Sequence, residues 1–364
     1  MTEPAPGPPS RAATACGLSF RIARCYTAPM RLAALLACLL AAPAGAQSPE
    51  EFFRNKQIRM VVGHPAGADY DTGARLLARY LGNHLPGKPG IVVQNMPAAG
   101  SIVAANYLYA QAPRDGLTFG SFSRNIPNQA ILGQANLEAD PRRFNWLGAT
   151  SQPGRVCVVS EISPVQTMDD AFTTEALMAG AGPGASLSIV PNVLNQVLGT
   201  KFRVIDGYNG PNDAVFAMER GEVHGVCNSF SQFRPHQHLI TSGKIRVLFR
   251  VEEAAFVAMP DAPTIYSRAK TAGQIDLLRF VFASTGFGRP YVLPPDAPAD
   301  RVEAFRTAFE AAVRDPGLLA EAKQAQIDMA PRSAGELVSL IGKLYATPAA
   351  TIETVRKIIP TGFN

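Results

Sequence analysis

The chain has 364 residues, of which 47% are hydrophobic and 17% are charged, and its formal net charge is +5. A chain of this length can bury the cores of two domains. Four arginines and one glutamate lie in residues 1–46, so the rest of the chain keeps 30 basic and 28 acidic residues and a charge near +2. This near balance gives little support to nucleic-acid or membrane-surface binding.

The N-terminal segment has the three parts of a secretory signal. Met30–Arg31 precedes the apolar run Leu32–Ala42, and an Ala-x-Ala site ends at Ala46. This pattern predicts export and cleavage after Ala46, with Met30 as an alternative translation start. The apolar run is too short to span a bilayer, and no apolar run after Ala46 approaches transmembrane length. A second interpretation is a lipoprotein signal, because Leu35–Cys38 loosely fits a lipid-attachment box.

Two of the five cysteines, Cys157 and Cys227, remain after the predicted cleavage. Both lie in apolar runs that are typical of strands, and an oxidising compartment permits them to pair. We expect a structural disulfide between them. The alternative is a pair of buried free thiols on neighbouring strands.

Strands and helices alternate in the first part of the chain. Short apolar runs predict three strands, at Ile58–Val62, Ile91–Val93 and Thr118–Phe122. Between them, helical spacing predicts one helix with Asp71 as its N-cap, running to about Leu81 or Leu85, and a second helix over Ile102–Ala110. This alternation predicts a parallel α/β sheet.

A strand over Phe144–Ala149 leads out of this unit into a second α/β unit. The strands predicted for the second unit are Val156–Ser160, Ala176–Gly182, Arg203–Ile205, Gly225–Asn228 and Lys244–Arg250. Its predicted helices lie near Thr167–Phe172, Ser186–Leu198 and Asn212–Arg220. The remainder is expected to be mostly helical, with helices at Ala299–Asp315, Gly317–Gln326, Ala334–Leu344 and Pro348–Ile358.

This order predicts two lobes that follow an N-terminal extension of residues 1–46. Residues 47–149 and 250–364 form the first lobe, and residues 150–249 form the second. The chain then crosses between the lobes twice, which makes a hinge, and ligands commonly bind in the crevice between such domains.

Two loops of the first lobe follow strands and precede helices. Small residues at such places let a ligand approach backbone amides, and helix N-termini favour an anion there. The carboxyl ends of parallel strands lie at one edge of the sheet, so both loops are expected to meet. The candidate ligand-binding residues are Ala66, Gly67, Ala68, Asp69 and Tyr70 in the first loop, and Ala98, Ala99, Gly100 and Ser101 in the second.

The third strand ends at the same edge and is followed by Ser123, Arg124 and Asn125. Arg124 is a candidate bidentate clamp for a carboxylate, and Arg155 is a weaker candidate of the same kind. In the second lobe, Gly184, Ala185 and Ser186 open a helix and are expected to offer free amides, together with the hydroxyls of Ser186 and Ser188. Candidates that follow other second-lobe strands are Tyr208, Asn209 and Asn228.

Signals of catalysis are poor. The chain has no Gly-x-Ser-x-Gly, no P-loop lysine and no His-Glu-x-x-His, and we expect neither a cofactor nor a metal. His236 and His238 lack further ligands that could complete a metal site. The acidic pairs Asp169–Asp170 and Glu252–Glu253 are interpreted as solvated faces.

Several short motifs together resemble one family. They are Pro65–Gly67, Tyr70–Asp71, Ala74–Arg75, Gln94–Ser101 and Ala112–Gly116, followed by Gly207–Gly210 and Glu219–Val223. This combination resembles the Bug family, the extracytoplasmic solute receptors of tripartite tricarboxylate transporters. The sequence differs from the family pattern at Ala68 or Asp69 and at Ala98, where glycine is usual, and Asp69 adds negative charge.

The resemblance implies a type II periplasmic-binding-protein fold, with two α/β lobes that close on a ligand. It also implies that the loops Ala66–Asp71 and Ala98–Ser101 grip a carboxylate, partly through ordered water. The predicted function is therefore a monomeric periplasmic receptor that delivers a small carboxylate, a di- or tricarboxylate or an aromatic acid, to a membrane permease. Two alternatives stay open: a sensor that presents its ligand to a membrane signalling protein, and a periplasmic enzyme on the same scaffold.

Overall fold

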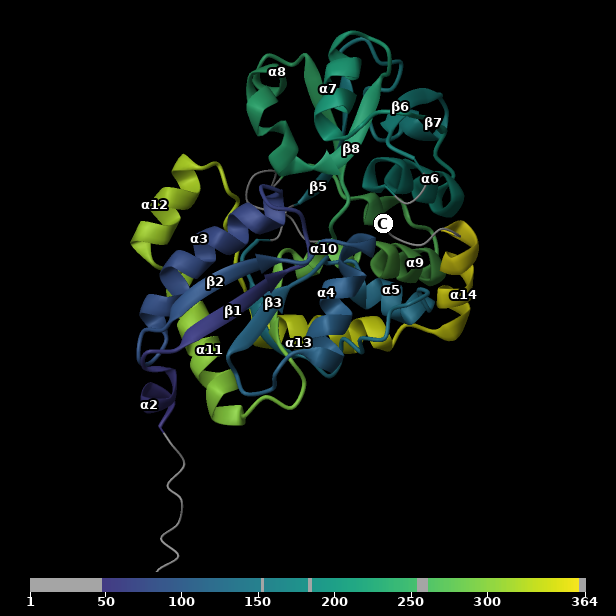
Figure 1. Ribbon diagram of the computed structural model, residues 1–364. Helices are drawn as coiled ribbons and strands as arrows, with labels where there is room; N and C mark the ends of the chain where they lie inside the picture. Colours follow the sequence, from purple (N-terminus) through teal and green to yellow (C-terminus); the bar gives the residue numbers. More distant parts are fainter. Residues whose placement is uncertain (1–47, 152–153, 183–184, 254–260, 360–364) are drawn as a thin grey trace, which may run out of the picture. The chain divides into compact units, whose positions relative to one another are not determined.

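The computed structural model describes residues 48–151, 154–182, 185–253 and 261–359 (Figure 1). The predicted signal, its cleavage site and the alternative lipid-attachment site lie outside these residues. Within them, no helix combines the length and the apolar character that crossing a membrane requires.

The first sheet has six strands in the order β11-β4-β10-β3-β1-β2. Their bounds are β1 Gln57–Val62, β2 Gly90–Asn95, β3 Thr118–Ser121, β4 Asn145–Ala149, β10 Pro290–Leu293 and β11 Arg332–Ser333. β1 pairs in parallel with β2 and β3, as the sequence predicts, but β10 pairs antiparallel with β3 and β4. The three predicted strands are therefore parallel, as expected, and the antiparallel β10 and β11, which were not predicted, make the whole sheet mixed.

Helices cover both faces of this sheet (Figure 1). Their bounds are α2 Pro49–Phe53, α3 Asp69–His84, α4 Ile102–Asn106 with a π-helical turn at Tyr107–Gln111, α5 Ile126–Leu132, α11 Ala299–Ala312, α12 Pro316–Gln324, α13 Ala334–Tyr345 and α14 Ala349–Ile358. Side chains alternate along each strand, so Met60 and Val62 pack in one core with α3, α11 and α12. Val61 packs in the other core with residues of α4, α5 and α13.

The second sheet has five strands in the order β7-β6-β8-β5-β9. Their bounds are β5 Arg155–Ser160, β6 Ala176–Gly180, β7 Phe202–Asp206, β8 Gly225–Ser229 and β9 Ile245–Arg250. α7 (Pro211–Glu219) packs against one face, and α6 (Ser186–Leu198) packs against the other. The helix predicted near Thr167–Phe172 is only a 3-10 turn at Asp170–Phe172, because the Asp170 carboxylate accepts the amides of Gln166 and Thr167.

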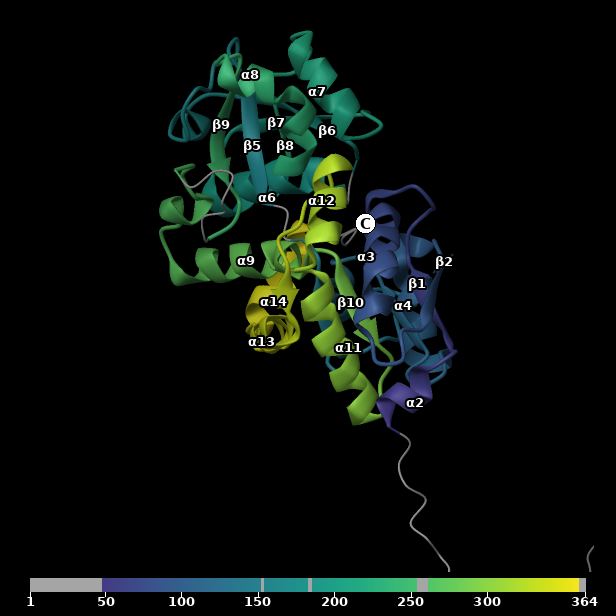
Figure 2. The same ribbon diagram turned by 90° about the vertical axis from the view of Figure 1, so that its left-hand side faces the viewer.

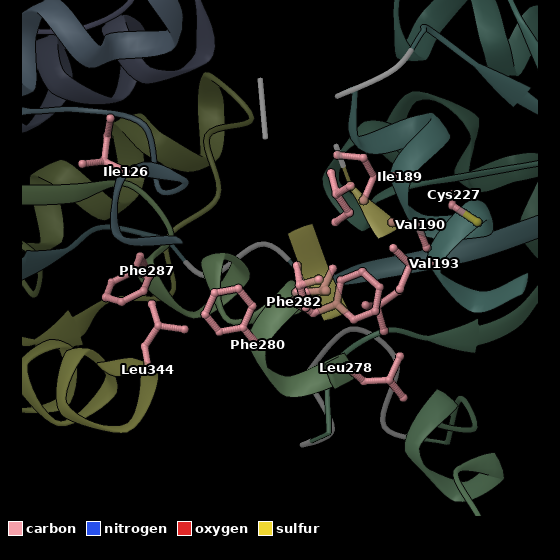
Figure 3. Packing of buried hydrophobic residues seen from close by; sticks show 14 of the residues in the cluster. Ile126, Ile189, Val190, Val193, Cys227, Leu278, Phe280, Phe282, Phe287 and Leu344 are labelled. Atoms are coloured by element: carbon pink, nitrogen blue, oxygen red, sulfur yellow. The ribbon is translucent and has the colours of Figure 1, made fainter. Parts of the chain in front are cut away.

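The helix α9 (Ala272–Phe282) follows the second sheet and packs against both α6 and α14 (Figure 2). Leu278, Phe280 and Phe282 of α9 share one apolar cluster with Val190 and Val193 of α6 (Figure 3). The same cluster continues into α13, so the apolar core is continuous from one sheet to the other. The lobe boundaries predicted from the sequence are retained as a proposal.

Cys157 on β5 and Cys227 on β8 face each other in the sheet and form a disulfide. The bond encloses a long stretch of chain, since the two residues are 70 positions apart.

Replacement of both cysteines by serine is expected to lower the free energy of unfolding by about 4 kcal/mol, because the unfolded chain gains conformational freedom without the cross-link. Urea denaturation checks this prediction, and wild-type protein in a reducing agent should match the double variant. Equal stability of the oxidised wild type and the variant contradicts it.

Candidate functional site

The first loop is organised by Asp71, but not as a helix N-cap. α3 begins at Asp69, so Asp71 lies within its first turn and the prediction of an Asp71 cap is wrong. The buried Asp71 carboxylate accepts hydrogen bonds from the Gly67 amide (2.8 Å), Arg75 Nε (2.9 Å) and Asn95 Nδ2 (2.7 Å). The Gly67 amide is therefore occupied and is not offered to a ligand.

The second loop turns through three consecutive left-handed residues. The φ angles of Ala99, Gly100 and Ser101 are 45°, 62° and 77°. Such backbone strain in residues other than glycine is concentrated at functional sites. Within the described parts of the chain, the amides of Ala99 and Gly100 have no hydrogen-bond acceptor.

Ser101 joins the two loops and is not placed to contact a ligand. It is buried, its hydroxyl donates to the Gly63 carbonyl (2.7 Å) and its amide donates to the Ala98 carbonyl (3.0 Å). Both of its donors are therefore occupied, which argues against the predicted binding role. A Cβ on Gly63 would lie 2.7 Å from Ser101 Oγ, so glycine is required for this close approach.

The two loops lie side by side. Asn95, which leads into the second loop, donates from Nδ2 to the His64 carbonyl of the first loop (2.9 Å). Ala66, Gly67 and Ala98 are exposed. The added charge of Asp69 is compensated, because its carboxylate pairs with the buried Arg289 (Nε–Oδ2, 3.0 Å). The helices that follow the two loops therefore begin at the same edge of the first sheet, and the negative charge of Asp69 at that edge is neutralised by Arg289.

Two arginines bring positive charge to this edge. Arg155 is buried, with only 4% of its surface exposed, and Arg124 is half-buried. In the ranges that the structure describes, neither guanidinium forms an ion pair with a carboxylate. Burial and the neighbouring charge of Arg124 lower the pKa of Arg155 to about 10, against the opposing effect of Glu252. An anion between these arginines would relieve their mutual repulsion.

Glu252 lies beside Arg155. The interpretation of Glu252 as part of a solvated face is therefore wrong. Its two carboxylate oxygens accept the Arg155 amide at 2.8 and 2.9 Å. Burial raises the pKa of Glu252, although the Arg155 amide and the charges of Arg155 and Arg124 oppose that rise. The Glu252 carboxylate thus binds the backbone amide of Arg155, and the guanidinium of Arg155 stays available to bind an anion.

Tyr70 and His64 form the aromatic part of the site. Their rings stack with centroids 3.8 Å apart and an interplanar angle of 8°. The Tyr70 hydroxyl donates to the Gly288 carbonyl (3.1 Å) and accepts the Arg124 amide (3.2 Å). Burial lowers the pKa of His64 to about 4, with Asp69 opposing and Arg124 reinforcing the shift, so the imidazole is neutral at pH 7. His64 was not among the predicted binding residues, although it directly precedes the motif Pro65–Gly67.

The second-lobe loop is less open to an anion than predicted. Asp206 Oδ1 accepts the Gly182 amide (2.9 Å) and the Ser188 hydroxyl (2.6 Å), and Ser188 Oγ accepts the Ala181 amide (3.0 Å). The prediction of a free Ser188 hydroxyl is therefore wrong, and Asp206 was not recognised. Ala185 and Ser186 are half-buried at the start of α6, and Gly184 lies outside the described residues.

Of the other second-lobe candidates, Asn228 lies on β8, and its side chain shares the face of Val156, opposite to that of Arg155. It is buried, and it pairs in register with Val156, the neighbour of Arg155. Its Oδ1 accepts the Ser229 amide (2.8 Å), and its buried Nδ2 has no partner among the described residues.

The remaining candidates have local partners. Asn209 donates from Nδ2 to Asp213 Oδ2 (3.1 Å). The charges that act on the Tyr208 hydroxyl are those of Glu222 and Arg220, and burial raises the pKa of Tyr208. In the first lobe, Ser123 Oγ accepts the amide of Asn125 (3.3 Å).

Two other features lie apart from the loops. A cavity of about 800 Å³ is lined by residues of α9 and α13 together with Glu252 and Tyr266, and by no residue of the two loops. His236 Nδ1 lies 2.8 Å from Glu219 Oε1. Among the described residues, no group of three or more His, Cys, Asp or Glu side chains is placed to hold a metal ion.

Solved structures share this fold. A solute-binding protein from Polaromonas, crystallised without ligand, superposes with a TM-score of 0.66 at 17% identity and covers 83% of this chain and 98% of its own. The R. palustris protein Rpa4515, solved with adipate, gives a TM-score of 0.55 at 19% identity and covers 84% of this chain and 97% of its own. These likenesses establish a two-lobed periplasmic-binding-protein fold.

Sequence comparison goes further than the fold. The chain is 27% identical over 249 residues to a UPF0065 protein from the gbd 5′ region of Cupriavidus necator, which covers 66% of this chain and 73% of that protein. The family model described as the tripartite tricarboxylate transporter family receptor matches residues 74–356. Because that match spans most of the chain, the protein belongs to the receptor family of the tripartite tricarboxylate transporters.

Proposed function

We propose that this protein is a periplasmic receptor that captures a small carboxylate and delivers it to a tripartite tricarboxylate-type membrane permease. Family membership supports the receptor role, and the adipate held by Rpa4515 supports a carboxylate as the ligand class. The predicted signal in residues 1–46 supports export, and we propose that the protein binds its ligand without converting it.

The observation that carries the proposal is the pair Arg124 and Arg155. A buried guanidinium without a carboxylate partner is costly unless an anion accompanies it. Burial, the larger effect, and the charge of Arg124 lower the pKa of Arg155 to about 10 against the opposing charge of Glu252, as expected for a poorly solvated cation near a second one. Arginine is suited to this task because its planar donors match a carboxylate bidentately.

The exposed loops supply a second set of donors. The amides of Ala99 and Gly100, and those of Asp69 and Tyr70 at the start of α3, have no acceptor in the described part of the chain. Backbone amides at helix starts bind carboxylates well. A ligand that spans from these amides to the arginines would carry one carboxylate at each end, which favours dicarboxylates over monocarboxylates.

A calorimetric screen tests this proposal. The processed protein is titrated with succinate, glutarate, adipate, citrate, benzoate, acetate and an uncharged diamide such as succinamide. We expect at least one dicarboxylate to bind about 100-fold more tightly than acetate, and no heat with the diamide. A bound ligand recovered unchanged supports binding without conversion. Tight binding of the diamide, or no binding of any carboxylate, contradicts the proposal.

A further inference from the structure

We propose that His64 determines specificity by accepting a hydrogen bond from a hydroxyl group of the ligand, so that the receptor prefers hydroxycarboxylates to the same acids without a hydroxyl. The inference rests on the proposed function, because it assumes that a carboxylate of the ligand lies at Arg124 and Arg155. The inference concerns the hydroxyl group of the ligand as a hydrogen-bond donor. Neither arginine can select such a donor, since a guanidinium donates hydrogen bonds and accepts none.

The hydrogen-bond network assigns the tautomer of His64. Ser101 Oγ carries one hydrogen and donates it to the Gly63 carbonyl (2.7 Å). The longer contact of Ser101 Oγ with His64 Nδ1 (3.4 Å) therefore requires Nδ1 to be the donor. Because burial keeps the ring neutral, with a pKa of about 4, Nε2 carries the lone pair. Across the described chain, no side chain or amide donates to this Nε2.

The ring of His64 is held in a fixed place beside the arginine. It stacks on Tyr70 at 3.8 Å, and the Tyr70 hydroxyl is held by the Gly288 carbonyl and the Arg124 amide. His64 also keeps part of its surface exposed. An acceptor that is held by its stacking partner, partly exposed and near enough to feel the charge of Arg124 recognises a donor at little entropic cost.

The charges around His64 are of both signs. Arg124 and Arg155 would repel an ammonium group placed between them, whereas at His64 itself Asp69 acts more strongly than Arg124. The carboxylate of Asp69, which could otherwise attract an ammonium, is already paired with Arg289. A hydroxyl has no such penalty, so hydroxycarboxylates fit better than amino acids.

Matched ligand pairs test this inference. Calorimetry compares succinate with each enantiomer of malate, glutarate with each enantiomer of 2-hydroxyglutarate, and propionate with each enantiomer of lactate. For the wild type, we expect one hydroxylated member of at least one pair to bind about 10-fold more tightly than its partner, which is the worth of one hydrogen bond. His64→Phe preserves the stack on Tyr70 but removes the acceptor, so this 10-fold preference should fall to about 1.

Two further variants separate recognition from packing. His64→Asn restores an acceptor and should recover part of the preference, whereas His84→Phe, on the far end of α3, should leave the wild-type ratio in place. Equal binding of every pair by the wild type overturns the inference while the carboxylate proposal stands. Equal weakening of both members of a pair by His64→Phe also overturns it, because it assigns His64 a purely structural role. Absence of binding by every acid overturns the carboxylate proposal and this inference with it.

Discussion

Replacement of Arg155 by methionine is expected to weaken carboxylate binding by at least about 100-fold without lowering the melting temperature of the free protein. Loss of a buried, charge-assisted partner costs binding a few kcal/mol. In the free protein, however, the charge of Arg155 is itself unfavourable. Burial and the charge of Arg124 lower its pKa to about 10 against the opposing charge of Glu252, so the charged side chain is disfavoured in the folded state. Methionine fills similar space without that cost.

Calorimetry and thermal melts of the ligand-free protein measure the two effects. The matched control is Arg246→Met on β9, an exposed arginine of the same sheet, which should change neither quantity. Arg155→Lys keeps the charge but loses the bidentate geometry, so its affinity should lie between those of the wild type and the methionine variant. Unchanged affinity in Arg155→Met would remove Arg155 from the site.

Replacement of Asp71 by alanine is expected to lower the free energy of unfolding by about 2–4 kcal/mol and to weaken ligand binding as well. The carboxylate accepts three hydrogen bonds, one from the Gly67 amide and two from side chains, Arg75 and Asn95. Without it, the first loop loses one of its two ties to β2, and the hydrogen bond from Asn95 to the His64 carbonyl remains. Asp213→Ala removes an exposed carboxylate with a single Asn209 partner and should cost far less.

The contribution of Asp71 also depends on pH. Burial opposes its ionised form, but the hydrogen bonds from Arg75, Asn95 and Gly67 outweigh burial and lower its pKa below the ordinary 3.8. A carboxyl with a lowered folded pKa stabilises the protein above its unfolded pKa, and that stability is lost as the pH falls through the folded pKa. Urea denaturation should therefore show a gap between wild type and Asp71→Ala at pH 7 that shrinks below about pH 3.8. A gap independent of pH would contradict this.

Local patterns predicted most of the secondary structure. Apolar runs and helical spacing located β1, β2, β3, α3 and α6 close to their observed bounds. They missed β10 because Pro290–Leu293 is only four residues long, lies in a mostly helical region and pairs with strands far away in the chain. Alternation alone could not reveal that the sheet is mixed.

The candidate site shows the same division between local and distant effects. The loops follow from glycine and small residues at the ends of strands, which are visible in the sequence. Whether their donors are free depends on partners that the sequence does not place, such as Asp206 for Gly182 and Arg289 for Asp69, which is 220 positions away. The tautomer of His64 likewise depends on where the Ser101 hydroxyl points.

The position of β10 bears on the order in which the chain can fold. Its residues, Pro290–Leu293, lie between β3 and β4 in the sheet, so the first lobe lacks a central strand until most of the chain has emerged from the ribosome. The second sheet, by contrast, is contiguous from Arg155 to Arg250 and its pairings are local by comparison. Delayed closure of long-range strand pairs slows folding. A nascent chain of this topology therefore completes its first sheet only after the second sheet has been synthesised.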